Sequence, residues 1–157
     1  MKVEHHAAHV ALVLDVRGEN LDHHPIAGER GQVQGLDLAG LADDGLQKGY
    51  QICTHAIGDR ANRETLDAYE SALKRHPQTD HRFRIEHAQV LAQQDIPRFA
   101  ALGVIASMQP IHATGDMFIA DRHWGARAAM GYAWKSLLDS GAVLAFGSDA
   151  PVEPMSP

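Results

Sequence analysis

The chain has 157 residues, of which 45% are hydrophobic, so it has enough apolar side chains for one domain with a buried core. A complete barrel of eight strands and eight helices typically needs roughly 250 residues, and this length excludes it. The formal net charge of −6 argues against a nucleic-acid partner, because the phosphate backbone favours a basic surface.

The sequence contains no pattern typical of a membrane or secreted protein. No apolar run is long enough to cross a bilayer, and the first residues lack the basic-then-apolar order of a signal peptide. The single cysteine, Cys53, excludes an internal disulfide and a cysteine-rich zinc site. We therefore expect a cytoplasmic protein without a membrane partner.

Residues 1–35 differ from the remainder and are treated as a divergent N-terminal segment. An apolar run at residues 10–14 predicts one strand, and the turn-rich residues after it predict a loop. His5, His6 and His9 would share a metal only on a helix, and neither a cap nor a helical period supports one. A solvated histidine-rich tail is the preferred interpretation.

In residues 36–157, short apolar strands alternate with amphipathic helices. The strands lack clean alternation, as expected when both faces of a sheet are covered. This repetition predicts an α/β fold with a parallel sheet, either part of a (β/α)8 TIM-type barrel or a small open sheet. The expected strands are 51–56, 82–86, 104–108 and 143–147; the expected helices are 36–46, 59–76, 91–102 and 132–140, with short helical pieces in 111–131.

Metal-ligand residue types follow three of these strands. His55 and His87 end successive strands one βα unit apart, and Asp149 follows the last strand. Imidazole and carboxylate are ligands of zinc-type ions, and the carboxyl ends of barrel strands share one mouth. Each residue alone also fits a loop hydrogen bond or a helix cap, but the repeated placement favours a divalent metal site. Asp149 is also the candidate proton acceptor.

Two further polar residues follow the strand at 104–108. Gln109 and His112 are candidates for substrate binding or for polarising a carbonyl group. A turn with incidental polar residues is an equal alternative. Cys53 lies inside a strand, where a small buried apolar group is the preferred interpretation.

Four phrases in chain order carry a family resemblance. They are THAIGDRANRETLDAY, FRIEHAQ, ASMQPIHATGD and LAFGSDAPVEP, and they resemble the amidohydrolase superfamily, closest to its family-3 branch, which includes N-substituted formamide deformylases. The resemblance implies a (β/α)8 barrel with one or two divalent metals, usually zinc. It places His55, His87 and Asp149 at barrel strands five, six and eight. It gives Asp149 the roles of metal ligand and proton acceptor.

The chain also departs from the family pattern. It contains no His-x-His pair, which the family places at strand one, and nothing around Lys2 matches the lysine often found at strand four. We therefore expect this chain to correspond to about strands five to eight of the barrel of a larger metal-dependent hydrolase. That enzyme is expected to cleave C–N bonds of small amides or N-formyl compounds. Little turnover is expected from this part alone.

Two other functions remain open. The chain could be a non-catalytic barrel remnant that forms a homo-oligomer or pairs with a missing half, or a small metal-binding module that uses its N-terminal histidines. Open edges at strands 51–56 and 143–147 favour self-association, unless strand 10–14 covers one of them. Four apolar residues are expected to form one interior layer: Ile52, Ile85, Ile105 and Leu144.

Overall fold

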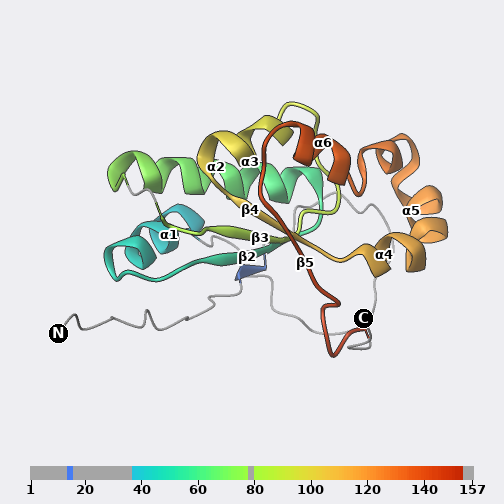
Figure 1. The fold of residues 1–157 in the computed structure, drawn as a ribbon, viewed down its shortest axis with the longest axis horizontal. Coiled ribbons are helices and arrows are strands. Elements are labelled where there is room, and N and C mark those ends of the chain that lie inside the picture. Colours follow the sequence, from blue (N-terminus) through green and yellow to red (C-terminus); the bar gives the residue numbers. More distant parts are fainter. Residues whose placement is uncertain (1–13, 16–36, 78–79, 154–157) are drawn as a thin grey trace.

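The computed structural model describes residues 14–15, 37–77 and 80–153. This part of the chain is a parallel sheet with helices between its strands, as Figure 1 shows. In chain order the elements are β1 (Leu14–Asp15), α1 (Leu38–Gln47), β2 (Cys53–Ala56), α2 (Asp59–Arg75), β3 (Arg84–His87), α3 (Ile96–Leu102), β4 (Ile105–Met108), α4 (Pro110–Gly115), α5 (Met117–Trp124), the 3-10 helix η1 (Gly125–Met130), α6 (Trp134–Asp139) and β5 (Leu144–Phe146).

The five strands lie in the sheet in the order in which they occur in the chain, and every neighbouring pair is parallel. One register row crosses the whole sheet through Asp15, His55, Glu86, Ser107 and Ala145. Because all strands point the same way, their carboxyl ends meet at one edge. This confirms the predicted α/β fold, and a run of βα units without strand crossing is consistent with part of a TIM-type barrel.

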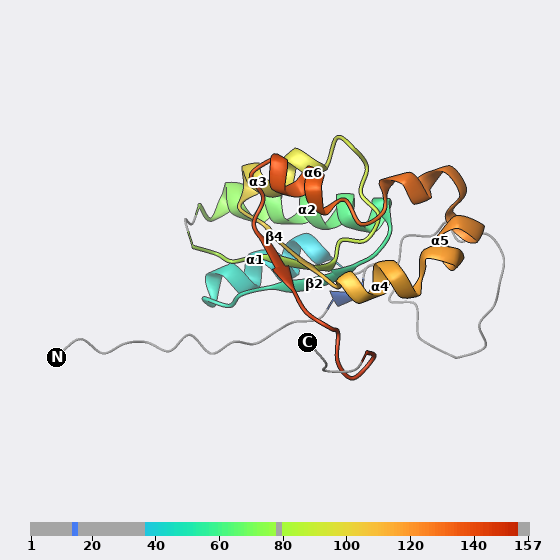
Figure 2. The same cartoon turned by 45° about the vertical axis from the view of Figure 1, so that its right-hand side comes forward.

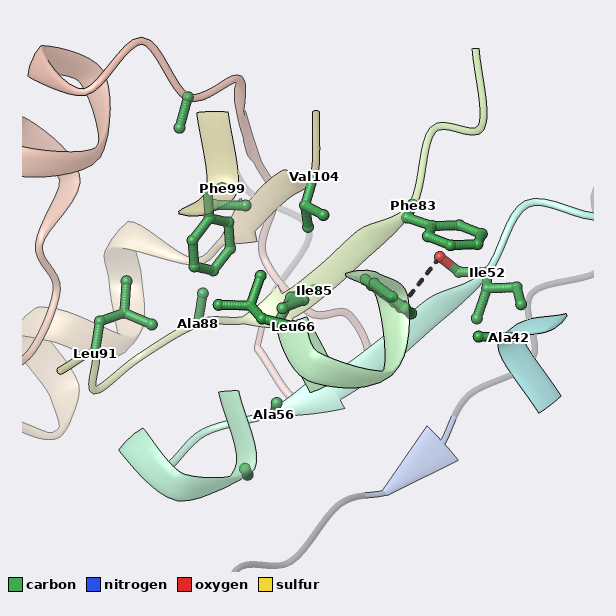
Figure 3. Packing of buried hydrophobic residues seen from close by; sticks show 14 of the residues in the cluster. Ala42, Ile52, Ala56, Leu66, Phe83, Ile85, Ala88, Leu91, Phe99 and Val104 are labelled. Carbon is green, nitrogen blue, oxygen red and sulfur yellow. Dashed lines mark hydrogen bonds between the residues drawn. The ribbon is translucent and has the colours of Figure 1, made fainter. Parts of the chain in front are cut away.

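The hydrophobic core lies between the sheet and helices α2, α3 and α6, which cover one face of it (Figures 1 and 2). Figure 3 shows Leu66 of α2 and Phe99 of α3 close to Ile85 of β3, and all three side chains are fully buried. Tyr69 of α2 adds a polar tie, since its hydroxyl lies 2.6 Å from Thr54 Oγ1 and donates to the carbonyl of Arg84 at 3.0 Å.

The opposite face of the sheet carries a different set of side chains. Ala106 pairs with Ile85 and faces the helices. Because successive side chains of a strand point to opposite faces, Ile105 points away from the helices and lies outside the core cluster. The predicted single layer is therefore wrong: Ile52 and Ile85 pack under the helices, whereas Ile105 lies on the other face. Arg84 and Glu86 form an ion pair on that face.

The start of one helix differs clearly from the prediction. Helix α3 begins at Ile96 instead of residue 91, because Asp95 closes a turn onto the carbonyl of Ala92 and Pro97 favours the first turn of a helix. The connection at 111–131 contains short helical pieces, as predicted, and these are α4, α5 and η1. In the described ranges, none of the helices has the length and apolar character to cross a membrane.

The edge of β2 that we expected to be open is covered. Leu14 and Asp15 of β1 pair with Thr54 and His55 of β2. This pairing corrects the prediction that strand 51–56 presents an unpaired edge. The predicted N-terminal segment otherwise lies outside the described residues, as do His5, His6 and His9.

Candidate metal centre

His55 and His87 meet at the carboxyl edge of the sheet. Their ring centroids lie 4.4 Å apart in an edge-on arrangement, because β2 and β3 are parallel neighbours and Ala56 pairs with His87. His87 ends its strand with a φ of 73° and Ala88 follows with a φ of 45°. Such left-handed residues cost free energy and concentrate at functional sites.

His112 and Asp149 complete a group around His87. His112 lies on α4, Asp149 follows β5, and one ligand-type atom from each of the three residues lies within 4.8 Å of the other two. His112 Nε2 and Asp149 Oδ2 are 4.0 Å apart. Asp149 also has a left-handed backbone, with a φ of 61°. Two imidazoles and one carboxylate at this spacing form a donor set suited to a zinc-type ion.

Gln109 determines which nitrogen of His87 can bind such an ion. Its Oε1 lies 2.9 Å from His87 Nδ1, and its Nε2 donates to the carbonyl of Ser107 at 3.5 Å. Since Oε1 only accepts, this contact selects the neutral tautomer with the proton on Nδ1, in which Nε2 has the free lone pair. Both side chains are buried, so water does not replace this contact.

A second polar cluster holds the backbone of His112. The hydroxyl of Tyr132 donates to the carbonyl of His112 at 3.1 Å and accepts from Gln89 Nε2. Gln89 Nε2 also donates to Asp116 Oδ2 at 3.3 Å. Burial raises the pKa of Tyr132, and the charge of Asp116 acts in the same direction. The phenol is therefore kept protonated as a donor.

The structure groups the predicted residues differently from the sequence analysis. His87 and Asp149, predicted as metal ligands, lie together, but the third member of their group is His112, which we predicted to bind substrate. His55 lies against His87 outside this group of three. Gln109, the other predicted substrate residue, lies in hydrogen-bond contact with His87. The roles of all five remain predictions.

Sequence reasoning missed the contribution of Tyr132 and Asp116. Both lie in or beside the long connection between β4 and β5, where no periodic pattern indicates which side chains face inward. Gln89 carried a weak signal, since it follows His87 in the same strand-end phrase. Cys53 is buried, and burial raises the pKa of its thiol, which disfavours a reactive thiolate.

Comparison with known proteins identifies the family. The profile of the amidohydrolase family matches residues 8–157. Protein LONG AFTER FAR-RED 3 of Arabidopsis thaliana is 43% identical over 113 residues, and YtcJ of Bacillus subtilis is 38% identical over 112 residues; each alignment covers 71% of this chain. The chain belongs to the amidohydrolase family, in its family-3 branch.

Two solved structures are similar to this chain in both sequence and fold. An uncharacterised metal-dependent hydrolase from Pyrococcus furiosus is 32% identical with a TM-score of 0.64, and one from Pyrococcus horikoshii is 30% identical with a TM-score of 0.65. Each match covers 76% of this chain, and 24% and 23% of the respective hydrolases.

The chain spans only a small share of these relatives. It covers 19% of the Arabidopsis protein and 21% of YtcJ. The family match begins at residue 8, so it includes most of the segment that we set apart as divergent. Family membership thus applies to nearly the whole chain.

Proposed function

We propose that this chain forms part of a metal-dependent hydrolase that cleaves C–N bonds in small amides or N-formyl compounds. The observation that carries the proposal is the group of His87, His112 and Asp149 at the carboxyl edge of the parallel sheet, with His55 against His87. In the proposed site His55, His87 and Asp149 hold a divalent ion, with zinc favoured. Gln109 and His112 serve the substrate.

The chemistry of the donor set supports this choice of ion. Neutral imidazole and carboxylate are common zinc ligands, and the contact from Gln109 leaves His87 with one accessible lone pair. When bound, such an ion supplies a Lewis acid and lowers the pKa of water. His112 is the one group member with two roles open to it, ligand or substrate contact.

Asp149 is proposed to move the proton. Its carboxylate accepts a proton from the attacking water, whose oxygen forms a bond to the carbonyl carbon. The C–N bond then breaks, and Asp149 returns the proton to the leaving nitrogen. The products are a carboxylic acid, or formate, and an amine. His112 lies near enough to Asp149 to contact the same substrate group.

We further propose that β2, β3, β4 and β5 correspond to strands five to eight of the family barrel. The parallel order of these four strands, with helices between them, supports this placement. The sheet face that carries Arg84 and Glu86 would then face the barrel interior. In this proposal residues 1–35 precede these strands and supply β1 beside β2, and further strands cover the open face.

An alternative function has its own support. The side chain of Arg84 is 40% exposed on the face opposite the helices, so the described sheet leaves part of its inner side open to water. A half-enclosed site binds a metal weakly and orients water poorly. Under this alternative the chain is a non-catalytic barrel remnant that oligomerises or pairs with another half.

Metal content and turnover separate the two functions. The experiment measures zinc per chain after reconstitution and dialysis, then hydrolysis of a panel of N-formyl amines and simple amides. The variants are His87→Asn and Asp149→Asn, with His123→Asn as a control, because His123 is exposed on α5. Zinc binding with turnover that Asp149→Asn abolishes supports the hydrolase. Zinc binding without turnover supports the remnant, and absence of zinc from the wild type overturns the metal site.

A further inference from the structure

Asn62 lies in the first turns of α2, fully buried beneath the edge of the sheet that carries the histidines. Its side-chain amide nitrogen faces four backbone carbonyl oxygens. Three belong to the end of β2 and the loop after it: the carbonyls of Ala56 and Ile57 lie at 3.2 Å and that of Gly58 at 2.8 Å. The fourth is the carbonyl of Val90 at 3.2 Å, in the loop that follows His87.

The same two loops are joined by backbone hydrogen bonds. Ala88 N–H donates to the carbonyl of Ala56 at 3.1 Å, and Val90 N–H donates to the carbonyl of Ile57 at 2.9 Å. The carbonyls of Ala56 and Ile57 thus accept from both the neighbouring loop and Asn62. Asn62 closes a small polar cluster immediately behind the two histidines.

The chemistry of this cluster requires a neutral donor. The carbonyls of Ala56, Ile57 and Gly58 already accept one backbone N–H each, so the two N–H groups of the Asn62 amide add a second, shared donor to them and reach the carbonyl of Val90 on the other loop. Asn62 itself has a buried Oδ1 without a hydrogen-bond partner among the described residues. The donating half of the amide therefore makes all of the side-chain hydrogen bonds of Asn62 found among the described residues.

We propose that Asn62 is a positioning residue that sets the distance between His55 and His87. It acts by tying the loop after β2 to the loop after β3, so that both imidazoles are held at one spacing before any ion binds. The metal-binding part of this inference rests on the proposed function. The tie between the loops does not, because it is defined by the hydrogen bonds alone.

The test uses two variants of Asn62 and one control. Asn62→Asp keeps the shape and replaces the donors by acceptors, and Asn62→Ser keeps one smaller donor. Leu66→Ala is the control: Leu66 is fully buried on the same helix, one turn further on, and its side chain makes only apolar contacts in the core. It lowers stability without removing a hydrogen-bond donor from the cluster.

Two measurements are made on each protein at a temperature where it is folded. The first is hydrogen exchange at the amides of Ala88 and Val90. Asn62→Asp is expected to accelerate exchange at these two amides more than at other core amides, whereas Leu66→Ala accelerates the core as a whole. In Asn62→Ser the exchange rates at these two amides are expected to lie between those of the wild type and of Asn62→Asp. Asn62→Ser is the test variant if Asn62→Asp does not fold.

The second measurement is the zinc Kd by competition with a chromophoric chelator. Asn62→Asp is expected to raise the Kd about 10–100-fold, the range seen when residues that orient metal ligands are lost, while Leu66→Ala leaves it within about twofold. Unchanged exchange at Ala88 and Val90 overturns the inference. Equal Kd values in Asn62→Asp and Leu66→Ala also overturn it. Failure of the wild type to bind zinc counts against the proposed function, and the exchange measurement then still decides the loop tie.

Discussion

The Nδ1 atom of His87 lies 2.9 Å from Oε1 of Gln109, and both side chains are buried. This contact joins the end of β3 to the residue that follows β4, so two adjacent strand ends share one hydrogen bond. It fixes the His87 tautomer and the plane of the ring. Gln109 therefore orients His87 through its Nδ1 atom, in addition to any contact that Gln109 makes with a substrate.

Replacing Gln109 by leucine is expected to weaken zinc binding by about 10–100-fold, because His87 loses the acceptor that holds its tautomer. Zinc Kd by competition titration measures the effect. Gln47→Leu is the matched control, since Gln47 is an exposed glutamine on α1. A Gln109→Leu protein with wild-type zinc affinity would show that the contact does not orient His87.

Replacing Tyr132 by phenylalanine removes the hydroxyl that joins His112, Gln89 and Asp116. The free energy of unfolding is expected to fall by about 1–3 kcal/mol, because partly buried polar partners lose a hydrogen bond. Urea denaturation measures this change. Tyr50→Phe is the control, because Tyr50 is 39% exposed, and it is expected to change stability by less than about 0.5 kcal/mol. Equal effects of the two substitutions would contradict the role of the cluster.

His81 is expected to make stability depend on pH. Burial lowers the pKa of His81 below its ordinary value of 6.5, and its Nδ1 accepts from the backbone N–H of Phe83 at 2.9 Å. The unfolded chain therefore binds a proton more readily than the folded one, so this contribution is present above pH 6.5 and is lost as the pH falls towards the lowered folded pKa.

The measurement for His81 is urea denaturation at pH 7.5 and at pH 5.5 in the wild type and in His81→Asn. Asparagine keeps an acceptor for Phe83 and does not titrate. The wild type is expected to lose more stability on acidification than the variant, because only the wild type has the depressed pKa. An identical pH dependence in both proteins would mean that His81 is not held neutral by the fold.

Much of the fold follows from local patterns in the sequence. The four strands after residue 36 lie within or close to their predicted ranges, because short apolar runs between glycines and prolines identify buried parallel strands. Helix α2 is predicted to within one residue, since its apolar stripe and the following Pro77 are strong signals. The face of the sheet to which each side chain points is harder to predict than the strand itself. Ile85 and Ile105 are both apolar, but the register of β3 and β4 places them on opposite faces.

The candidate site is predicted less completely than the fold. Strand ends identify His55, His87 and Asp149 because parallel topology brings them to one edge. The position of His112 in the site depends on how α4 is oriented after Gln109. The hydrogen bond from Tyr132 to the carbonyl of His112 joins two residues that are 20 positions apart in the chain. Such contacts depend on the path of a long connection, which has no period in the sequence.

The last prediction concerns self-association through β5. Among the described strands β5 lies at the end of the sheet, and its outer edge has no partner there, whereas β1 covers the edge of β2. Val143 and Phe146 are 59% and 57% exposed beside this edge. An exposed strand edge with apolar neighbours favours pairing with another chain. We therefore expect dimers or larger species at micromolar concentration.

Analytical ultracentrifugation of the wild type and of Val143→Lys tests this expectation. A lysine at this edge introduces a charge that a second strand would have to bury, so the variant is expected to shift towards the monomer. Val152→Lys adds the same charge at a side chain that is 71% exposed beyond the sheet, and it is expected to associate like the wild type. A wild type that remains monomeric and unfolds cooperatively would contradict the open edge. If both lysine variants dissociate equally, the association depends on net charge instead of on β5.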